Sequence, residues 1–279
     1  MYPDLSFLGV KPADHQVTLW LAVVVGGAFV WTSAAREGLR SGRVILAAGL
    51  ITMFALAGGR LHYVLWHLDH FRTRPWTDVL SVRGLHTPGA VIGEVVGAPL
   101  VLWMLGLPIM RLLDVIAPAA CVGVAISRIG CFLRGCCFGT TCDRPWCVAF
   151  PHDSPAFRHH VDLGLIPPDA VTSLAVHPLQ LYFAFAALAV TGIVLWRRPH
   201  KRFDGEVALL GLFLFSLEVA VLEPLRDDRF LQLSVGSLRT AALILAVASG
   251  SLLASTIMRN RGRQDSAGDR PTSRRRFAG

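Results

Sequence analysis

The sequence predicts an all-α polytopic membrane protein with about seven transmembrane helices. The 279 residues are 53% hydrophobic and only 16% charged, whereas soluble domains carry about 25% charged residues. The apolar residues are clustered into runs close to the roughly 20 residues that cross a bilayer as a helix. Basic residues gather between alternate runs, which is typical of cytoplasmic loops in such proteins.

The apolar runs predict the helices in order along the chain. They occupy residues 17–34, 44–67, 88–106, 108–127, 178–196, 205–223 and 236–258. The first follows Asp4 and Asp14 without a basic start, so we expect a retained helix and not a cleaved signal peptide. The second is long enough to tilt. The third and fourth are separated only by residues 106–108, which form either a tight turn or part of a re-entrant feature.

The runs also predict the domain organisation. We expect residues 1–258 to form one transmembrane domain, with residues 128–176 as a small head outside the membrane. Loops of this length usually have a function. Residues 259–279 are rich in arginine and are expected to form a disordered basic tail.

The distribution of lysine and arginine predicts the orientation. These residues gather after the first, fifth and seventh runs, at Arg36, Arg40, Arg43, Arg197, Arg198, Lys201, Arg202 and along the C-terminal tail. The positive-inside rule places these loops in the cytoplasm, with the N-terminus outside and the C-terminus inside. The net charge of +8 then reflects topology and contact with membrane lipids. No folded basic domain accompanies the tail, so we expect no nucleic-acid partner.

A second group of charges lies at the opposite ends of the helices. Arg60 is inside the second run, about 10 Å from its outer end at 1.5 Å per residue. An intramembrane arginine usually faces a polar interior and has a partner. Polar, glycine or proline residues stand at this depth in five segments, at Arg60–His62, Arg83–Gly89, Arg128, His177–Tyr182 and Glu223–Asp228.

These segments predict a site for an anionic lipid headgroup in the outer leaflet. Arginine binds phosphate through two hydrogen bonds, and glycine allows a backbone to approach a ligand closely. The alternative is that the arginines are interfacial anchors whose side chains snorkel to water. In the corresponding alternatives, His177 only caps a helix beside Pro178, and Glu223 only balances the charge of Arg226.

The order of these motifs resembles the prolipoprotein diacylglyceryl transferase family over about residues 40 to 230. The most specific family motif is Gly-Arg-Ile-Gly-Asn-Phe followed by Glu and Gly, and here it is Ser127–Phe132 followed by Cys136 and Gly139. The other matches are Gly59-Arg60-Leu61, Pro88–Gly93, Pro145-Trp146, Phe150-Pro151, His177–Tyr182, Gly205, Glu223 and Arg226.

The resemblance implies a seven-helix enzyme of the bacterial plasma (inner) membrane. Such an enzyme moves the diacylglyceryl group of phosphatidylglycerol to the lipobox cysteine thiol of a prolipoprotein and releases glycerol phosphate, without a cofactor or metal. It implies the catalytic candidates Arg128, Glu223, Cys136 and His86. The implied substrate-binding candidates are Arg60, Gly89, Gly130, Gly139, His177, Gln180, Tyr182 and Arg226. Arg128 would contact the phosphate, and Glu223 would order the site or transfer a proton.

The chain departs from the family pattern at its proton-handling positions. Pro88 replaces a histidine, for which His86 is a possible substitute, Cys131 replaces an asparagine, Cys136 replaces a glutamate, and Val219 replaces an arginine. Two other functions therefore stay open. The first alternative is a non-catalytic lipid-binding relative that acts in envelope assembly. The second is a membrane thiol-redox protein.

The cysteines carry three alternatives of their own. Cys131, Cys136, Cys137, Cys142 and Cys147 fall outside the predicted membrane segments, in a compartment that permits disulfides. The first alternative is a set of structural disulfides. The second is a zinc or cluster site, although the paired Cys-x-x-Cys pattern is missing. The third is a functional thiol, for which Cys136 near Arg128 is the best candidate. Cys121 is expected to be a buried small apolar residue.

Overall fold

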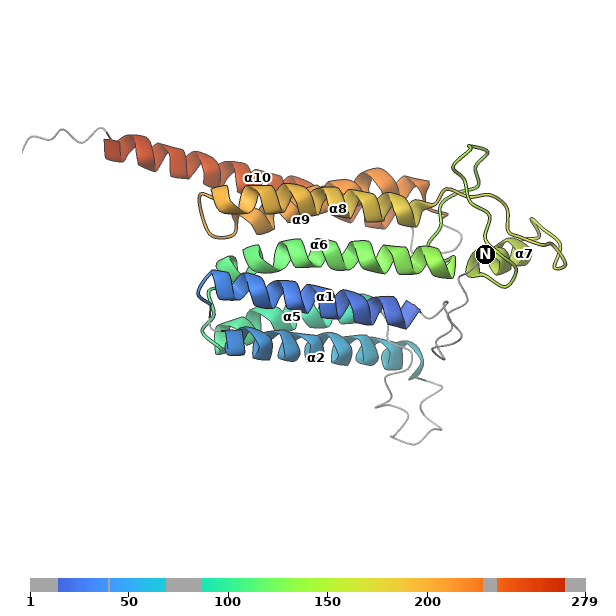
Figure 1. Cartoon of the computed structure of the whole chain (residues 1–279), viewed down its shortest axis with the longest axis horizontal. Coiled ribbons are helices and arrows are strands. Elements are labelled where there is room, and N and C mark those ends of the chain that lie inside the picture. The colour runs from blue at the N-terminus through green and yellow to red at the C-terminus, as the bar shows by residue number, and fades with distance from the viewer. Residues whose placement is uncertain (1–14, 40, 69–86, 228–234, 269–279) are drawn as a thin grey trace, which may run out of the picture. The chain divides into compact units, whose positions relative to one another are not determined.

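The computed structural model describes residues 15–39, 41–68, 87–227 and 235–268 (Figure 1). Within these ranges a helix occurs at each of the seven predicted runs. The helices are α1 (His15–Arg36), α2 (Ser41–Trp66), α5 (Thr87–Met104), α6 (Ile109–Arg134), α8 (Leu179–Arg197), α9 (Glu206–Leu222) and α10 (Val235–Gly268). Extended pairing in the same ranges is limited to isolated β-bridges. The predicted all-α fold is therefore confirmed.

The helices have the length and composition of membrane spans. Five of the described helices, α2, α6, α8, α9 and α10, are long and apolar enough to cross a bilayer, and the apolar parts of α1 and α5 are shorter. Large apolar side chains are exposed on these helices, among them Phe185, Val221 and Val247. A helix that is apolar on its outward faces is typical of a protein surrounded by lipid.

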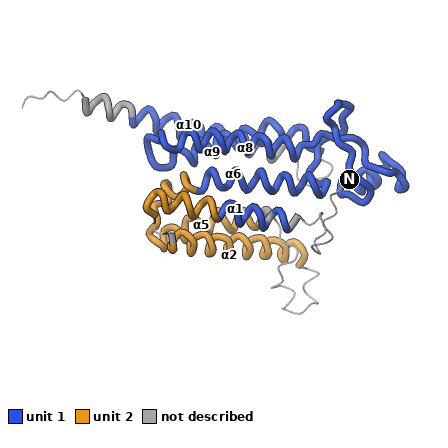
Figure 2. Tube along the Cα trace, viewed as in Figure 1, with its two compact units in different colours: residues 1–27, 116–279 blue, residues 28–115 orange. Residues whose placement is uncertain are grey.

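The chain divides into two compact units (Figure 2). One unit contains residues 28–115, and the other contains residues 1–27 and 116–279. The second unit, which we call the site unit, includes most of α6, all of α8, α9 and α10, and the loops between α6 and α8. It holds most of the residues that the sequence nominates for function.

In the unit of residues 28–115, α2 and α5 pack through glycine. Gly89, Gly93 and Gly97 are spaced by four residues on α5, and a Cβ added to any of them would collide with Phe54, Gly58 or His62 of α2. Small residues at this spacing let two membrane helices approach closely and gain van der Waals contact. The family-like block that enters α5 therefore serves helix packing.

In the site unit, α9 packs between α8 and α10, and α1 packs on α6. Val190, Val194, Val207 and Cys121 form a buried cluster, which confirms that Cys121 is a buried small residue. A Cβ on Gly130 would collide with the Thr18 hydroxyl of α1, so the glycine of the Arg128-Ile129-Gly130 motif is a helix contact.

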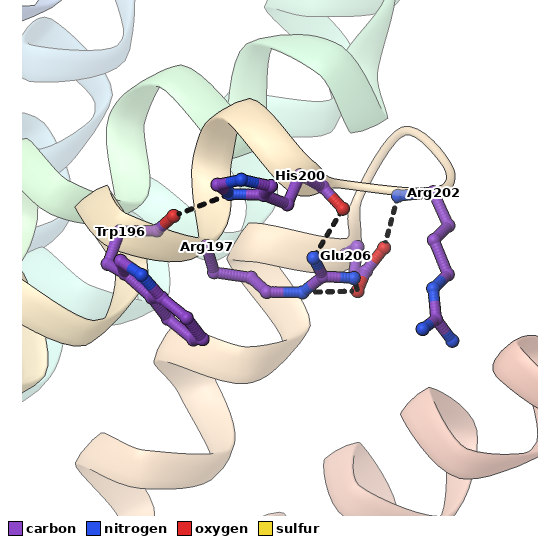
Figure 3. Close-up of polar contacts among 5 residues, drawn as sticks. All are labelled: Trp196, Arg197, His200, Arg202 and Glu206. Atoms are coloured by element: carbon purple, nitrogen blue, oxygen red, sulfur yellow. Dashed lines mark hydrogen bonds and ion pairs between the residues drawn. The ribbon is translucent and has the colours of Figure 1, made fainter.

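The turn between α8 and α9 is held by a buried carboxylate (Figure 3). Glu206 is 2% exposed, and its Oε1 accepts a hydrogen bond from Arg197 Nε at 2.9 Å. The backbone N–H of Arg202 donates to Oε2, and His200 Nδ1 lies 3.2 Å from the Trp196 carbonyl oxygen. The charge of Glu206 is thus paired, which lets α8 and α9 reverse direction with a buried acid at the turn.

The segment between α6 and α8 forms a small head with its own core. Phe138, Phe150, Ala156 and Val176 are buried together. Its one described helix is α7 (Pro155–Asp162), which begins where Ser154 Oγ accepts a hydrogen bond from the Phe157 N–H at 3.1 Å. A serine N-cap followed by proline is a strong start signal for a helix.

Replacing Gly93 by leucine should destabilise the protein by about 1–3 kcal/mol or more, because the side chain would force α2 and α5 apart. Gly49 is the matched control on α2, since a Cβ there meets nothing within 4 Å. Thermal unfolding of the purified protein in detergent measures the effect. Equal unfolding temperatures for Gly93→Leu and Gly49→Leu would contradict the glycine contact.

Candidate functional site

The candidate site lies where α6, α8 and α9 of the site unit meet the head (Figure 1). α6 continues to Arg134, beyond the predicted end at residue 127. Arg128 and Gly130 are therefore inside the helix and not in the loop that follows. Hydropathy falls at Arg128, but hydrogen bonding continues until a residue that ends the helix, which is Gly135.

Two arginines share one aromatic ring at this site. The Arg128 guanidinium carbon lies 4.5 Å from the centroid of the Phe183 ring, and the Arg226 guanidinium carbon lies 5.7 Å from it. Phe183 is in α8 and is 1% exposed. Cation–π attraction of about 0.5–2 kcal/mol holds each arginine against the ring. Positive charge from α6 and from the end of α9 is thereby concentrated at one place.

Arg226 is neutralised by Glu223. Its Nε donates to Glu223 Oε1 at 2.7 Å and its Nη2 donates to Oε2 at 3.1 Å, so the pair is bidentate. Glu223 is 3% exposed and Arg226 is 6% exposed. Both carboxylate oxygens are occupied, so Glu223 orders the site by fixing Arg226. The pair is the contact that the alternative interpretation of Glu223 predicted, in which its carboxylate balances the charge of Arg226.

Arg128 is the cation of the site without such a partner. No hydrogen bond or ion pair to its guanidinium occurs among the residues that the structure describes. Its charge acts on Glu218, a buried residue of α9 whose two carboxylate oxygens have no hydrogen-bond partner in the same part of the chain. The five N–H donors of Arg128 are therefore not used by protein acceptors in the described part of the chain.

The end of α6 folds Cys136 back onto Cys131. Gly135 has φ 74°, its N–H donates to the Phe132 carbonyl at 3.0 Å, and the Cys136 N–H donates to the Cys131 carbonyl at 3.1 Å. These two bonds around a left-handed glycine form a Schellman motif. The helix cap thus brings two cysteines together that are five positions apart.

Cys137 joins the same cluster. Its φ of 57° lies in the left-handed region, which a residue with a Cβ adopts at a cost of about 1–2 kcal/mol. The sulfur atoms of Cys131, Cys136 and Cys137 all lie within 4.8 Å of one another, and all three thiols are free. Strain of this kind persists where the surrounding structure requires the conformation, and it is common at functional sites.

The cluster stabilises one thiolate. The pKa of Cys137 is lowered, chiefly by hydrogen bonds from the thiols of Cys131 and Cys136, and the positive charges of Arg128 and Arg226 add to this against the effect of burial. The pKa of Cys136 is raised by its hydrogen bonds with the other two thiols and by burial. The surroundings thus favour the thiolate form of Cys137 over those of its two neighbours.

Gln180 connects α8 to this turn. It is fully buried, and its Nε2 donates to the Cys136 carbonyl oxygen at 2.7 Å. Its Oε1 has no hydrogen-bond partner among the described residues. The amide group thus holds the cysteine turn and leaves one buried acceptor unused in the described part of the chain.

Backbone hydrogen bonds hold together the three chain segments that border the site. The Gly139 N–H donates to the His177 carbonyl at 3.0 Å, and the Thr140 N–H donates to the Leu225 carbonyl at 2.8 Å. A Cβ on Gly139 would lie 2.7 Å from the Leu225 carbonyl oxygen. His177 Nδ1 in turn lies 3.2 Å from the Tyr182 hydroxyl. Glycine at 139 therefore allows the head to close on the ends of α8 and α9.

The family model for prolipoprotein diacylglyceryl transferase matches residues 11–254 of this chain. The chain belongs to this family. The phosphatidylglycerol–prolipoprotein diacylglyceryl transferase of Finegoldia magna is 22% identical over 242 residues, which cover 86% of this chain and 88% of the relative. The enzyme of the same name from Synechococcus elongatus is 28% identical over 243 residues, covering 83% and 78%. That of Shewanella oneidensis is 29% identical over 196 residues, covering 69% and 66%.

Membership confirms the family resemblance, and it makes this chain a relative of multi-pass membrane transferases of lipoprotein biosynthesis. Six residues nominated from the family motifs lie together in the site unit: Arg128, Gly139, His177, Gln180, Glu223 and Arg226. Cys136 and Tyr182 adjoin them through Gln180 and His177. Gly130, also nominated, packs on α1.

Two nominated residues lie in the unit of residues 28–115, and a third is not among the described residues. Arg60 belongs to the unit of residues 28–115, where its guanidinium lies 5.1 Å from the Tyr63 ring centroid. Gly89 packs on α2 in that unit. His86 lies outside the described residues. For these positions the substrate and catalytic roles stay predictions.

The sequence analysis did not nominate Glu218, Phe183 or Cys137, which the structure places beside Arg128 or in the cysteine cluster. An acid inside the apolar run 205–223 is a signal that was available for Glu218, because intramembrane carboxylates are rare and usually functional. Phe183 gave no signal, since an aromatic residue in a membrane helix is ordinary.

The cysteine connectivity is now defined. Cys142 and Cys147 are joined in a disulfide, and their Cα atoms lie 6.1 Å apart.

Glu223→Ala should destabilise the protein by about 3–5 kcal/mol, because it leaves Arg226 buried without a counter-charge. The double variant Glu223→Leu with Arg226→Met should cost less, since no unpaired charge remains. Asp204→Asn is the control, because it breaks the exposed Lys201–Asp204 pair, worth about 0–1 kcal/mol. Unfolding titrations in detergent would contradict the buried pair if Glu223→Ala matched the control.

Proposed function

We propose that this chain transfers the diacylglyceryl group of phosphatidylglycerol to the cysteine thiol of a prolipoprotein lipobox segment. The observation that carries the proposal is the half-buried Arg128, held on Phe183 with its N–H donors uncommitted among the described residues. An arginine at the end of a membrane helix whose donors no described protein group uses is available to an anionic ligand. A phospholipid phosphate is such a ligand, and the named relatives act on phosphatidylglycerol and prolipoprotein.

The roles of the residues follow from the leaving group. When the thiol sulfur bonds to the glyceryl carbon, the bond from that carbon to the phosphate oxygen breaks, and glycerol phosphate leaves with an additional negative charge. In this proposal Arg128 stabilises this charge. Glu223 holds Arg226 in position. Glu218, buried with both oxygens uncommitted in the described part of the chain, accepts the thiol proton.

The remaining elements of the proposal concern location. We infer a bacterial plasma-membrane protein with the N-terminus outside and the C-terminus in the cytoplasm, which places the site at the outer leaflet. The arginine and lysine residues between α1 and α2, between α8 and α9, and after α10 support this orientation. The phospholipid then enters from the membrane and the lipobox segment from the outer side.

Arg128→Ala should lower the transfer rate by about 100- to 1,000-fold, as expected for the loss of one donor that stabilises developing charge. The assay combines purified protein, phosphatidylglycerol vesicles and a lipobox peptide, and mass spectrometry detects the thioether product. Arg134→Ala is the matched control, since Arg134 is an exposed arginine in the last turn of the same helix. Wild-type protein that retains phosphatidylglycerol without forming product would contradict the transferase and indicate a lipid-binding relative.

Glu218→Gln should lower kcat by about 100-fold or more, because the proton acceptor is lost. It should not lower the unfolding temperature, since a neutral amide replaces a buried carboxylate without a hydrogen-bond partner in the described residues. Retention of phosphatidylglycerol by the variant, measured after purification, separates a lost chemical step from lost binding. Full activity of Glu218→Gln would remove Glu218 from the mechanism.

A further inference from the structure

Three free thiols at the site have no part in the mechanism above. In the described part of the chain, two sets of three cysteine or histidine side chains place their ligand atoms within 4.8 Å of one another. One set contains Cys142 and Cys147, whose sulfurs are bonded to each other and are not available as thiolates. The other set is Cys131, Cys136 and Cys137, and all three of its sulfurs are free.

The spacing of the free sulfurs fits one metal ion. Two sulfurs bound to the same tetrahedral zinc at about 2.3 Å each lie about 3.8 Å apart. The three sulfurs already lie within 4.8 Å of one another, so small side-chain rotations bring them to bonding distance. A single disulfide, by contrast, uses two of the three sulfurs and leaves the third thiol without a function.

We propose that Cys131, Cys136 and Cys137 bind one zinc ion, and that its fourth position takes the thiol of the acceptor peptide. The binding of the acceptor thiol rests on the proposed transferase function, whereas the binding of zinc by the three cysteines does not. Zinc sites with four protein ligands are structural, and sites with three protein ligands and one open position are catalytic. This cluster supplies three ligands, so the open position is available to a substrate.

The chemistry of thiol alkylation favours zinc at this position. A thiol that coordinates zinc is deprotonated by the ion and remains a thiolate near neutral pH. Copper(I) prefers soft ligands and a low coordination number. A copper ion bound by three thiolates would therefore have no position left for a substrate thiol. Zinc with three thiolates carries a net charge of −1, and Arg128, one turn before Cys131 in α6, supplies compensating positive charge.

The backbone arranges these ligands before any metal binds. The Schellman motif at Gly135 places Cys136 against Cys131, and the left-handed conformation of Cys137 directs the third thiol into the same cluster. Gln180 fixes the turn through its hydrogen bond to the Cys136 carbonyl. Ligands on a helix end and an ordered turn lose little entropy on binding, which favours metal affinity.

The acceptor thiol gives its proton to Glu218 and binds zinc as a thiolate. A sulfur electron pair then forms the S–C bond to the glyceryl carbon of phosphatidylglycerol. The C–O bond to the phosphate breaks, and its electron pair leaves on the oxygen of glycerol phosphate beside Arg128. The thioether product has no negative charge on sulfur, so it is a weak zinc ligand and leaves the fourth position.

Metal content tests the site without an activity assay. The full-length protein is purified anaerobically in detergent, and zinc is measured by elemental mass spectrometry. We expect one zinc per chain in the wild type, a loss of at least tenfold in occupancy for Cys137→Ser, and full occupancy for Cys121→Ala. Cys121 is the matched control because it is a free, buried cysteine of the same helix, away from the cluster.

Folding is monitored in parallel, since a cysteine variant that unfolds would also lose metal. Size-exclusion profiles and unfolding temperatures identify such a variant, and Cys131→Ser then replaces Cys137→Ser in the comparison. Protein without bound zinc, or protein in which copper occupies the cluster, would overturn the proposal. A disulfide between two of the three cysteines in the anaerobically purified protein would also overturn it.

Cobalt(II) tests the fourth position. Cobalt replaces zinc in thiolate sites, and its absorption reports the number of sulfur ligands. Addition of a lipobox peptide should change the spectrum of the cobalt-loaded protein, and a peptide with serine in place of the lipobox cysteine should not. If the two peptides give the same spectrum, zinc does not bind the acceptor. These measurements stand even if no transfer is detected, so they separate failure of the metal site from failure of the transferase function.

Discussion

The pairing of Arg226 with Glu223 is the interaction on which the candidate site depends. An arginine buried near the end of a membrane helix is tolerated only when its charge is met and its donors are used. Glu223 does both through two hydrogen bonds, and Phe183 covers the remaining face of the guanidinium. Arg226 is committed in this way, whereas the donors of Arg128, which also lies against Phe183, are not used by any described residue.

A local helix-ending motif creates the chemical character of the site. Gly135 ends α6, and the turn that follows gathers three thiols beside two arginines. Two of these thiols, Cys131 and Cys136, stand where the family motif carries an asparagine and a glutamate. Two of the four replaced positions thus belong to the thiol cluster, whereas Pro88 and Val219 lie outside it.

Glycines that look like ligand contacts in the sequence serve mainly to bring backbones together. Gly89 allows α2 and α5 to touch, Gly130 allows α1 to pack on α6, and Gly139 allows the head to approach the end of α9. In lipid, helices gain little from the hydrophobic effect, so close backbone approach is a main source of packing energy. A motif glycine in a membrane protein thus supports the site by shaping the scaffold around it.

The sequence by itself determined the membrane class, the positions of seven helices and the family, because apolar run length and motif order are local properties of the chain. It also nominated Arg128, Glu223 and Arg226, since charges in apolar surroundings are conspicuous. Only the tertiary structure decided which charge is paired and which is available, and which cysteines bond. Those outcomes depend on side chains from α6, α8 and α9 that meet in space, as Glu218 and Phe183 do with Arg128. Contacts between distant segments leave no periodic trace in a single sequence, so the position of Arg128 on Phe183 had to come from the fold, whereas the Glu223–Arg226 pair, three residues apart, could be foreseen from the sequence.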